Sequence, residues 1–337
     1  MSGILMMIIA IVVLGGAYLL YGRYLQNKWG IDPKAKTPAY EMEDGVDYVP
    51  ADTNVVFGHQ FASIAGAGPI NGPIQAAIFG WLPVLLWILI GGVFFGAVQD
   101  FASMYASVKN KGRTIGYIIE AYIGKLGKKL FLLFCWLFCI LVVAAFADVV
   151  AGTFNGFVAN DAGAVTKVAA NGAVATTSML FIFEAVALGF FLKYTKFNKW
   201  INTAVAILLL VAAIVLGLNF PMYVSLGTWH IIIFVYILIA SVAPVWALLQ
   251  PRDYLNSYLL IFMIVGAVIG VFVANPSCNL KAFTSFNVDG QYMFPILFVT
   301  IACGAVSGFH SLVSSGTASK QIKNEKNMLP VSFGAML

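Results

Sequence analysis

Residues 57–80, FGHQFASIAGAGPINGPIQAAIFG, form a long stretch almost without charge that is interrupted by glycine and proline between Gly66 and Pro73. Its length and lack of charge match a bilayer span of about 20 residues. Proline removes a backbone donor and glycine weakens a helix, so the backbone groups that are released need other partners. In hydrocarbon such an interruption persists only where other protein or a water-filled cavity supplies them. The pattern therefore predicts an unwound helix of the kind that lines a transport site.

The composition indicates a polytopic membrane protein. Of the 337 residues, 61% are hydrophobic and only 10% are charged, whereas a soluble domain carries about 25% charged residues. The basic residues behind the net charge of +5 lie in loops between apolar runs, so the charge does not indicate a nucleic-acid partner. The four cysteines, Cys135, Cys139, Cys278 and Cys303, lack the spacing of a metal site. We expect no metal and no cofactor.

Apolar runs separated by charged gaps predict an all-α transmembrane bundle in a single domain over residues 1–337. Nine spans are expected near 4–22, 57–80, 81–107, 130–157, 178–193, 201–219, 230–250, 254–274 and 294–312. The apolar tail from residue 331 resembles the start of a tenth span, so we expect the chain to be a fragment of a longer protein. Residues 114–124 are expected to form a short helix at the membrane surface, and residues 158–177 a flexible loop.

The distribution of basic residues predicts the orientation. All of the 19 Lys and Arg residues except Lys167 and Lys281 fall in loops that the nine-span arrangement places on one side. Cytoplasmic loops are enriched in Lys and Arg, so this arrangement puts the N-terminus outside. The first apolar run has no basic residue before it, which is the opposite of a secretory signal peptide.

A second interruption is expected in residues 240–254, ASVAPVWALLQPRDY, where Pro244 and Pro251 flank Trp246 and Gln250. The interrupted spans are the second and the seventh, so they cross the membrane in opposite directions. Transporters built from two inverted repeats of five spans carry discontinuous helices in corresponding positions of each half. The pattern predicts such a repeat with its second half incomplete. Proline kinks that serve packing alone are the alternative.

Ionisable residues inside expected spans are candidates for function, because they are costly in a bilayer. Asp100 lies on the order of 10 Å inside the boundary at Lys109, from a rise of about 1.5 Å per residue. His59 enters the membrane from the same side, so the two side chains could meet and bind a coupling proton, or form a structural hydrogen bond. Asp148 and Glu184 either belong to a proton path or are satisfied locally.

Two further segments leave alternatives open. Residues 304–317, GAVSGFHSLVSSGT, place small residues and hydroxyls around His310, which either lets helices approach closely or binds a carboxylate or an ion. Arg252 precedes Asp253. It binds a substrate carboxylate, pairs with Asp253 or Asp100 as a gate, or reaches the membrane surface with its charged end.

Four motifs resemble those of the carbon starvation (CstA) family of bacterial inner-membrane proteins. They are GHQFASIAGAGPINGP (58–73), GAVQDF (96–101), PVWALLQPRDYLNSYLL (244–260) and SGFHSLVSSGT (307–317). The resemblance extends from about Tyr21 to Leu337. It implies uptake of peptides, or in some members of pyruvate with protons, during starvation. It also implies a fold near that of the amino acid–polyamine–organocation transporters, whose helices form a five-plus-five inverted repeat.

We therefore predict a multi-pass transporter of the bacterial plasma membrane, surrounded by lipid, that takes up small carboxylate-bearing nutrients (peptides or pyruvate) with H⁺. Backbone N–H groups freed near Gly66–Gly72 would face the substrate carboxylate, because helix N-termini favour anions. The candidate substrate-binding residues are Gly66, Gly68, Pro69, Gly72, Trp246, Gln250, Ser314 and Ser315. The candidate coupling or gating residues are His59, Asp100, Arg252, Asp253 and His310.

Two other functional classes are alternatives. A membrane nutrient sensor would bind the substrate without net transport. An intramembrane hydrolase using His59 or His310 would need a nucleophile elbow or a paired metal-ligand motif, and the sequence contains neither.

Overall fold

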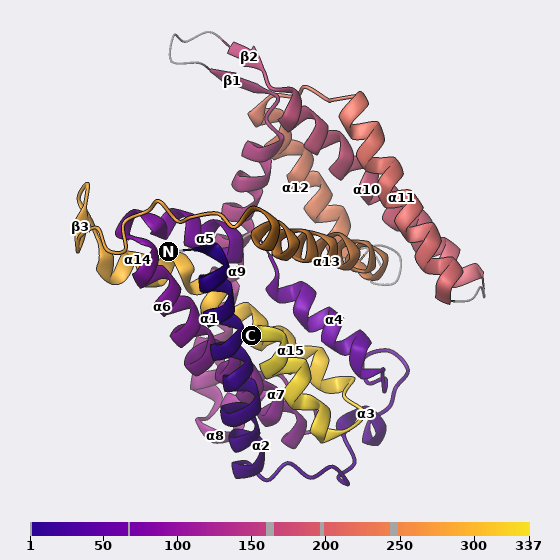
Figure 1. The fold of residues 1–337 in the computed structure, drawn as a ribbon. Helices are drawn as coiled ribbons and strands as arrows, with labels where there is room; N and C mark the ends of the chain where they lie inside the picture. The colour runs from indigo at the N-terminus through magenta and orange to yellow at the C-terminus, as the bar shows by residue number, and fades with distance from the viewer. Residues whose placement is uncertain (1, 67, 160–164, 196–198, 243–248) are drawn as a thin grey trace. The chain divides into compact units, whose positions relative to one another are not determined.

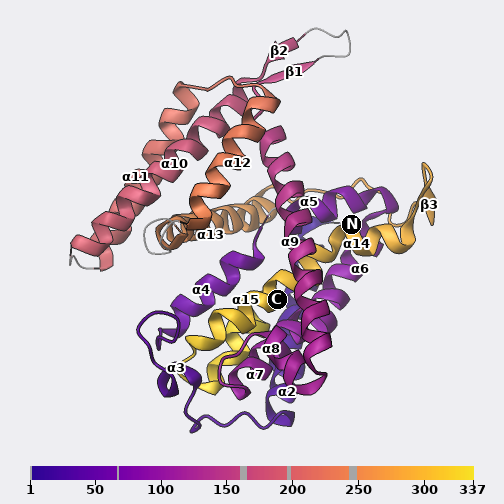
Figure 2. The same cartoon turned by 180° about the vertical axis from the view of Figure 1, so that it is seen from behind.

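A computed structural model of the chain describes residues 2–66, 68–159, 165–195, 199–242 and 249–337 (Figure 1 and Figure 2). The chain divides into two compact units. The first unit consists of Met1–Leu130 and Met263–Leu337, and the second of Phe131–Phe262. Both chain ends therefore belong to the first unit.

The first unit consists of short helices joined by turns and two extended connectors. Its α-helices are α1 (Gly3–Gly16), α2 (Arg23–Lys28), α3 (Pro38–Glu41), α4 (Thr53–Ile64), α5 (Gly68–Ala76), α6 (Trp81–Gly91), α7 (Val98–Lys109), α8 (Ile115–Tyr122), α14 (Met293–Ala305) and α15 (Gly308–Gly316). Segments of π-helix cover Ala17–Gly22, Gly92–Ala97 and Leu329–Gly334, and 3₁₀ turns cover Ala77–Phe79, Ala318–Lys320 and Glu325–Asn327. Strands β3 (Asn287–Val288) and β4 (Gln291–Tyr292) pair antiparallel. The short helix expected in residues 114–124 is confirmed as α8.

The second unit consists mainly of long helices. Its elements are α9 (Lys125–Phe154), β1 (Phe157–Ala159), β2 (Val165–Lys167), α10 (Ala169–Tyr194), α11 (Lys199–Asn219), α12 (Leu226–Val242) and α13 (Leu249–Ala274), of which α9 and α13 continue into the first unit. Strands β1 and β2 pair antiparallel, and α10 and α11 pack against each other.

Residues 158–177 were expected to form a flexible loop, and that expectation is wrong for those of them that the structure describes. Residues 158–159 and 165–167 belong to the paired strands β1 and β2, and residues 169–177 form the first turns of α10. Alanine has the highest helix propensity, and the segment 169–177 contains four alanines. Gly172 and Gly217 allow close packing here, because a Cβ at Gly172 would lie 2.9 Å from the Met222 carbonyl and one at Gly217 would overlap Thr177.

The all-α membrane class is confirmed. Among the described residues, six helical segments are long and apolar enough to cross a membrane: Gly3–Lys28, Trp81–Lys109, Lys125–Phe154, Ala169–Phe191, Ile201–Asn219 and Met293–Lys320. Two shorter apolar helices, Leu226–Val242 and Tyr258–Ala274, correspond to the expected spans 230–250 and 254–274. The inverted repeat stays a prediction.

The interruption predicted in residues 57–80 is confirmed, and it is narrower than expected. Helix α4 ends at Ile64 and α5 begins at Gly68, so only residues 65–67 separate them. The expectation of an unwound backbone through Gly72 is wrong, because Gly68, Pro69 and Gly72 are helical. Proline is tolerated in the first turn of a helix, where its missing N–H would have no intrahelical partner.

A second interruption lies in the expected span 294–312, which was predicted to be continuous. Helix α14 ends at Ala305 and α15 begins at Gly308. The Ser307 hydroxyl caps α15 by accepting a hydrogen bond from the Phe309 N–H at 3.3 Å, as serine commonly does at this position. The interruption predicted in residues 240–254 includes residues 243–248, which lie outside the described residues.

The two interrupted helices run past each other in opposite directions, because α5 packs against α14 while α4 packs against α15. Their backbones nearly touch. A Cβ at Gly72 would lie 2.5 Å from the Thr300 carbonyl oxygen, and one at Gly304 would lie 2.9 Å from the Cα of Pro69. A Cβ at Gly68 would overlap the Cys303 side chain. Small residues at helix contacts allow this approach in membranes.

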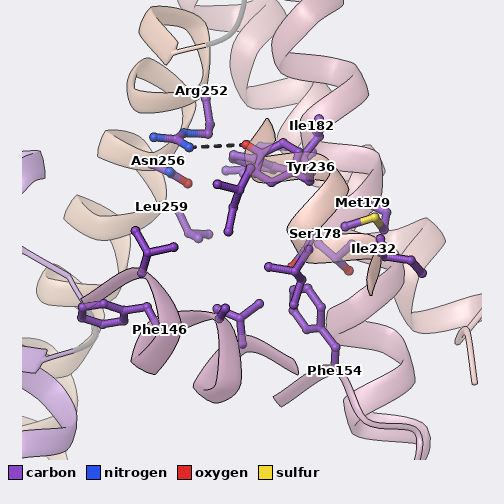
Figure 3. A pocket seen from close by; sticks show the side chains of 18 of the residues that line it. Phe146, Phe154, Ser178, Met179, Ile182, Ile232, Tyr236, Arg252, Asn256 and Leu259 are labelled. Carbon is purple, nitrogen blue, oxygen red and sulfur yellow. Dashed lines mark hydrogen bonds between the residues drawn. The ribbon is translucent and has the colours of Figure 1, made fainter. Parts of the chain in front are cut away.

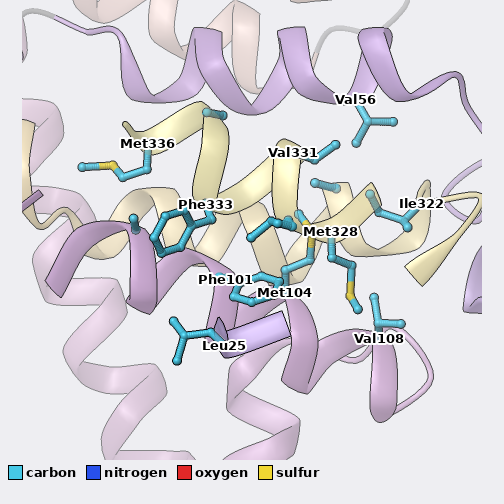
Figure 4. Packing of buried hydrophobic residues seen from close by; sticks show 14 of the residues in the cluster. Leu25, Val56, Phe101, Met104, Val108, Ile322, Met328, Val331, Phe333 and Met336 are labelled. Carbon is cyan, nitrogen blue, oxygen red and sulfur yellow. The ribbon is translucent and has the colours of Figure 1, made fainter. Parts of the chain in front are cut away.

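A hydrophobic core joins α4, α7, α2 and the C-terminal π-helix in the first unit (Figure 4). Phe101, Met104 and Phe333 are fully buried in it, and Val56 covers it from α4. The Phe101 ring stacks on Trp29 with centroids 4.7 Å apart. This core holds α7 against the segment that follows α15.

The segment 317–328, here called the linker, is held to the preceding loops by polar contacts. Glu325 is 3% exposed, and Lys109 Nζ donates to its two carboxylate oxygens at 2.7 and 2.8 Å. The Asp32 N–H donates to the same carboxylate at 2.9 Å. Lys323 Nζ instead reaches an exposed Asp52 at 2.6 Å, and this hydrogen bond raises the pKa of Lys323.

The glycine contact gives a prediction for stability. Gly72→Ala should lower the free energy of unfolding by about 1–3 kcal/mol, because the added methyl group overpacks a backbone contact. Gly66→Ala is the matched control, since nothing lies within 4 Å of a Cβ at that exposed position. Thermal unfolding of both variants in detergent measures the difference. Equal midpoints for the two variants would show that the α5–α14 contact is absent.

The linker contacts give a second prediction. Lys109→Met should destabilise the protein by about 3–5 kcal/mol, because it leaves the Glu325 charge buried without its partner. Lys323→Met should change the unfolding midpoint little, because its pair is exposed to solvent. Adding Glu325→Gln to Lys109→Met should restore part of the loss. If the double variant unfolds at the same midpoint as Lys109→Met, the destabilisation does not come from the unpaired Glu325 charge.

Candidate functional site

Three buried polar side chains meet in the first unit where α4, α7 and α15 pack together. They are Gln60 on α4, Asp100 on α7 and His310 on α15, and each is at most 2% exposed. We call them the polar cluster. Polar groups in a membrane protein interior are costly unless they are paired, so their convergence marks this place as the candidate site.

The Asp100–His310 pair is close without being hydrogen-bonded. Asp100 Oδ2 lies 3.9 Å from His310 Nδ1, which is longer than a hydrogen bond between these atoms. Within the described residues, neither of these two atoms nor Gln60 Oε1 has a hydrogen-bond partner. Gln60 is also a hydrogen-bonding neighbour of the Asp100 carboxyl. Carboxylate and amide oxygens accept hydrogen bonds, and an imidazole nitrogen accepts or donates, so the cluster has the acceptors to bind a proton.

Hydrogen bonds from serine hydroxyls and from the Gln60 amide hold the three helices around the cluster. Ser314 Oγ donates to the Asp100 carbonyl at 2.9 Å, and Ser107 Oγ donates to the Ser315 carbonyl at 2.8 Å. Gln60 Nε2 donates to the His310 carbonyl at 3.3 Å. Each of these bonds joins a side chain to the backbone of another helix. They fix the distance between α7, α15 and α4 without using the Asp100 carboxylate.

The backbone is irregular on both sides of the cluster. The π-helix Gly92–Ala97 ends three residues before Asp100, and the interruption at residues 306–307 lies three residues before His310. A Cβ at Gly96 would overlap the Ala305 carbonyl, so the two irregular segments touch. Single π-helical turns occur frequently at functional sites.

The substrate-binding residues predicted in the first unit lie close to this site. Ser314 and Ser315 are fully buried, and their hydroxyls donate to the carbonyls of Asp100 and Leu312. Gly68, Pro69 and Gly72 pack against α14, whereas Gly66 is exposed in the interruption. These contacts are structural, and substrate binding by these residues stays a prediction.

The predicted coupling residues divide between the two units. His310 contacts Asp100, and the half-buried His59 precedes Gln60 on α4. Arg252 belongs to the second unit and Asp253 follows it on α13, where the Asp253 and Gln250 side chains lie outside the described residues. Trp246 lies outside them altogether. Sequence reasoning missed Gln60, although an amide beside a histidine in an apolar run was the signal for it.

Two other ionisable residues lie in the second unit. Asp148 Oδ1 lies 3.1 Å from His230 Nε2, and both side chains are exposed. This local pair favours the alternative in which Asp148 is satisfied by a neighbour. Glu184 Oε2 is buried and has no hydrogen-bond partner among the described residues, so its role stays open.

The second unit also contains a cavity of about 620 Å³ between α9, α10, α11, α12 and α13 (Figure 3). Its wall is largely apolar, with Phe146 and Phe154 on one side and Ile182 on another. Arg252 lies at one end and donates from Nη1 to the Tyr236 hydroxyl at 3.5 Å.

Comparison with known proteins shows the family. The family model described as carbon starvation protein CstA matches residues 2–337. The chain belongs to the CstA family. This is a family of membrane transporters and not of enzymes, and the chain is therefore a multi-pass membrane protein of that family. No solved structure matches the chain.

Curated CstA-family relatives cover nearly all of the chain. The peptide transporter CstA of Escherichia coli is 36% identical over 95% of this chain and 46% of that protein. The peptide transporter CstA of Bacillus subtilis is 37% identical over 100% of this chain and 56% of its own length. The pyruvate/proton symporter BtsT of Escherichia coli is 36% identical over 95% and 45%. The chain spans about half the length of these relatives.

Proposed function

We propose that the protein, in its whole form, is a secondary transporter of the bacterial plasma membrane that couples proton entry to uptake of a small carboxylate-bearing nutrient. The similar proteins named peptide transporter CstA and pyruvate/proton symporter BtsT support this substrate class. The observation that carries the coupling is the buried Asp100–His310 pair beside two interrupted helices.

A proton changes the charge of this pair. With an ionised Asp100 and a neutral His310, one negative charge lies buried among helices, which is unfavourable in low dielectric. A proton on Asp100 removes the charge and supplies an O–H donor. Gln60 Oε1 and His310 Nδ1 are the acceptors within the cluster for that donor. The protonated and deprotonated forms thus favour different packing of α4, α7 and α15.

The interruptions in the two helices would allow a change in the protonation of Asp100 to move α4 and α15. Helix α4 ends at Ile64 before α5 begins at Gly68, and α14 ends at Ala305 before α15 begins at Gly308. Helices α5 and α14 are held together by their glycine contacts. In the proposal, α4 and α15 pivot at the interruptions relative to the α5–α14 pair. A ligand or proton shifts such an equilibrium only by binding one state more tightly, and the polar cluster spans the elements that would move.

The N-terminus-outside orientation and the inverted repeat belong to this proposal. The positions of Lys and Arg along the chain support the orientation. The antiparallel pair of interrupted helices, residues 53–76 and 293–316, supports a discontinuous-helix transporter. The interruption expected in residues 240–254 stays a prediction, because residues 243–248 lie outside the described part of the chain.

The coupling role gives a testable outcome. In proteoliposomes of the full-length protein, Asp100→Asn should abolish accumulation of labelled pyruvate or labelled alanyl-alanine driven by a proton gradient. The variant should still exchange substrate in counterflow, because the amide keeps the shape of the carboxyl group and loses only its ability to take up a proton. His310→Gln should reduce accumulation in the same assay.

Asp148→Asn is the matched control, since it makes the same substitution at an exposed site, and it should leave accumulation unchanged. Undiminished accumulation by Asp100→Asn would remove Asp100 from the mechanism. Binding of substrate by the unmodified protein without counterflow would instead identify a membrane sensor.

A further inference from the structure

Helix α8 and the start of α9 carry an excess of positive charge in the first unit. Residues 111–130 contain five basic side chains and one acidic side chain, and we call this segment the basic surface. Four of its five basic side chains are exposed: Lys111, Arg113, Lys125 and Lys129. The fifth, Lys128, is partly buried.

The single carboxylate of the basic surface does not neutralise this charge. Glu120 accepts a hydrogen bond from Lys128 Nζ, and the same ammonium group lies 3.9 Å from the centroid of the Tyr117 ring. The hydrogen bond from Lys128 lowers the pKa of Glu120, and the charges of Lys125 and Arg113 contribute to this shift. Arg113 and Lys125 therefore lie on either side of one carboxylate that is already bonded to a third cation.

Other basic side chains of the first unit have carboxylate partners. Lys109 pairs with Glu325, Lys320 with Asp47, and Lys323 with Asp52. Within the described ranges, the four exposed cations of the basic surface form no ion pair of this kind. Their charge is thus available to an anionic partner.

Exposed apolar side chains lie between these cations. Tyr122 and Ile123 are 76% and 74% exposed, and Leu126 is 71% exposed. The segment continues directly into α9, which is long and apolar enough to cross a membrane. Tyrosine and amphipathic helices favour the depth at which headgroups meet acyl chains. The basic surface therefore presents cations and apolar groups together at the place where a membrane-spanning helix begins.

We propose that the basic surface binds anionic phospholipids of the adjacent leaflet. The headgroup phosphate pairs with Arg113 and Lys125, while Tyr122 and Ile123 contact the upper part of the acyl chains. A guanidinium fork matches two phosphate oxygens, and an ammonium group adds a point charge. Clusters of Lys and Arg beside a membrane-spanning helix attract anionic lipid in this way. The inference needs only the membrane location of the chain, so it does not depend on proton coupling.

Lipid binding to the purified full-length protein in neutral maltoside micelles tests the proposal. The probes are dioctanoyl-phosphatidylglycerol and dioctanoyl-phosphatidylcholine, which share their acyl chains and differ in headgroup charge, and thermophoresis of the labelled protein measures both affinities. The unmodified protein should prefer phosphatidylglycerol by at least about 30-fold, which is the effect of two basic residues at about 1 kcal/mol each. In 1 M salt, where the Debye length is about 3 Å, the preference should fall.

A pair of double variants tests the residues that bind the headgroup. Arg113→Gln combined with Lys125→Gln should lower the phosphatidylglycerol affinity about 30-fold and leave the phosphatidylcholine affinity unchanged. Lys128 keeps its bond to Glu120 in this variant. Lys34→Gln combined with Lys36→Gln is the matched control, because it removes the same charge from exposed positions of the same unit. It should leave both affinities unchanged. The ratio of the two affinities does not depend on the fraction of folded protein.

A second pair of variants tests the apolar contact. Ile123→Ser should weaken both lipids about 10-fold, because a side chain that contacts the acyl chains is lost. The ratio of their affinities should stay the same. Val46→Ser is the control, since Val46 is 82% exposed in a loop, and it should change neither affinity.

Three results would overturn the proposal: equal affinity of the unmodified protein for the two lipids, equal losses in the two double variants, or an unchanged affinity for both lipids in Ile123→Ser. Displacement of phosphatidylglycerol by inorganic phosphate at equal concentration would also overturn it, because the site would then bind a free anion and not a lipid. Proton-driven uptake is measured separately in proteoliposomes. Loss of uptake in Asp100→Asn with an unchanged preference for phosphatidylglycerol would support the coupling proposal and this one independently.

Discussion

The backbone contact between α5 and α14 determines where the other elements of the first unit lie. Gly72 against Thr300 and Gly304 against Pro69 bring two helices closer than any larger residue would permit. Because each of these helices belongs to an interrupted pair, the contact also sets α4 beside α15. Helix α7 then packs against α15, and the carboxyl group of Asp100 meets the imidazole of His310. The polar cluster can form because Gly72 and Gly304, which lie elsewhere on the same interrupted helices, have no side chains to keep α5 and α14 apart.

The hydrogen bonds that hold these helices together do not involve the Asp100 and His310 atoms that face each other. The serine hydroxyls of α7 and α15 bond to backbone carbonyls and hold the helices together. In the described residues, the Asp100 and His310 atoms that face each other have no such bonds. Buried polar groups are normally satisfied, and unsatisfied ones call for an explanation such as a functional role. A proton-binding role gives that explanation, because a proton placed between Asp100 Oδ2 and His310 Nδ1 would give both atoms a hydrogen-bonding partner.

Local features of the sequence predicted part of this arrangement. The interruption after Ile64 was predictable because glycine and proline act on the backbone at their own positions. The interruption at 306–307 was missed because no proline marks it, and a serine cap and a packed glycine neighbour produce it instead. The paired strands β1 and β2 and the early start of α10 were also missed, since small residues are compatible with loop and regular structure alike. Arg252 was singled out, but its place in a cavity depends on five helices.

The sequence by itself determined that the chain is a bundle of membrane helices, that the helix within residues 57–80 is interrupted, and which ionisable residues lie in apolar segments. Those properties follow from composition and from backbone chemistry that acts over a few residues. Only the tertiary structure decided that His310 contacts Asp100, that Gln60 joins them, and that the glycines after residue 66 serve helix packing. Each of these outcomes brings together residues that are far apart along the chain, so it depends on which helices pack and at what distance, and no local pattern encodes that choice.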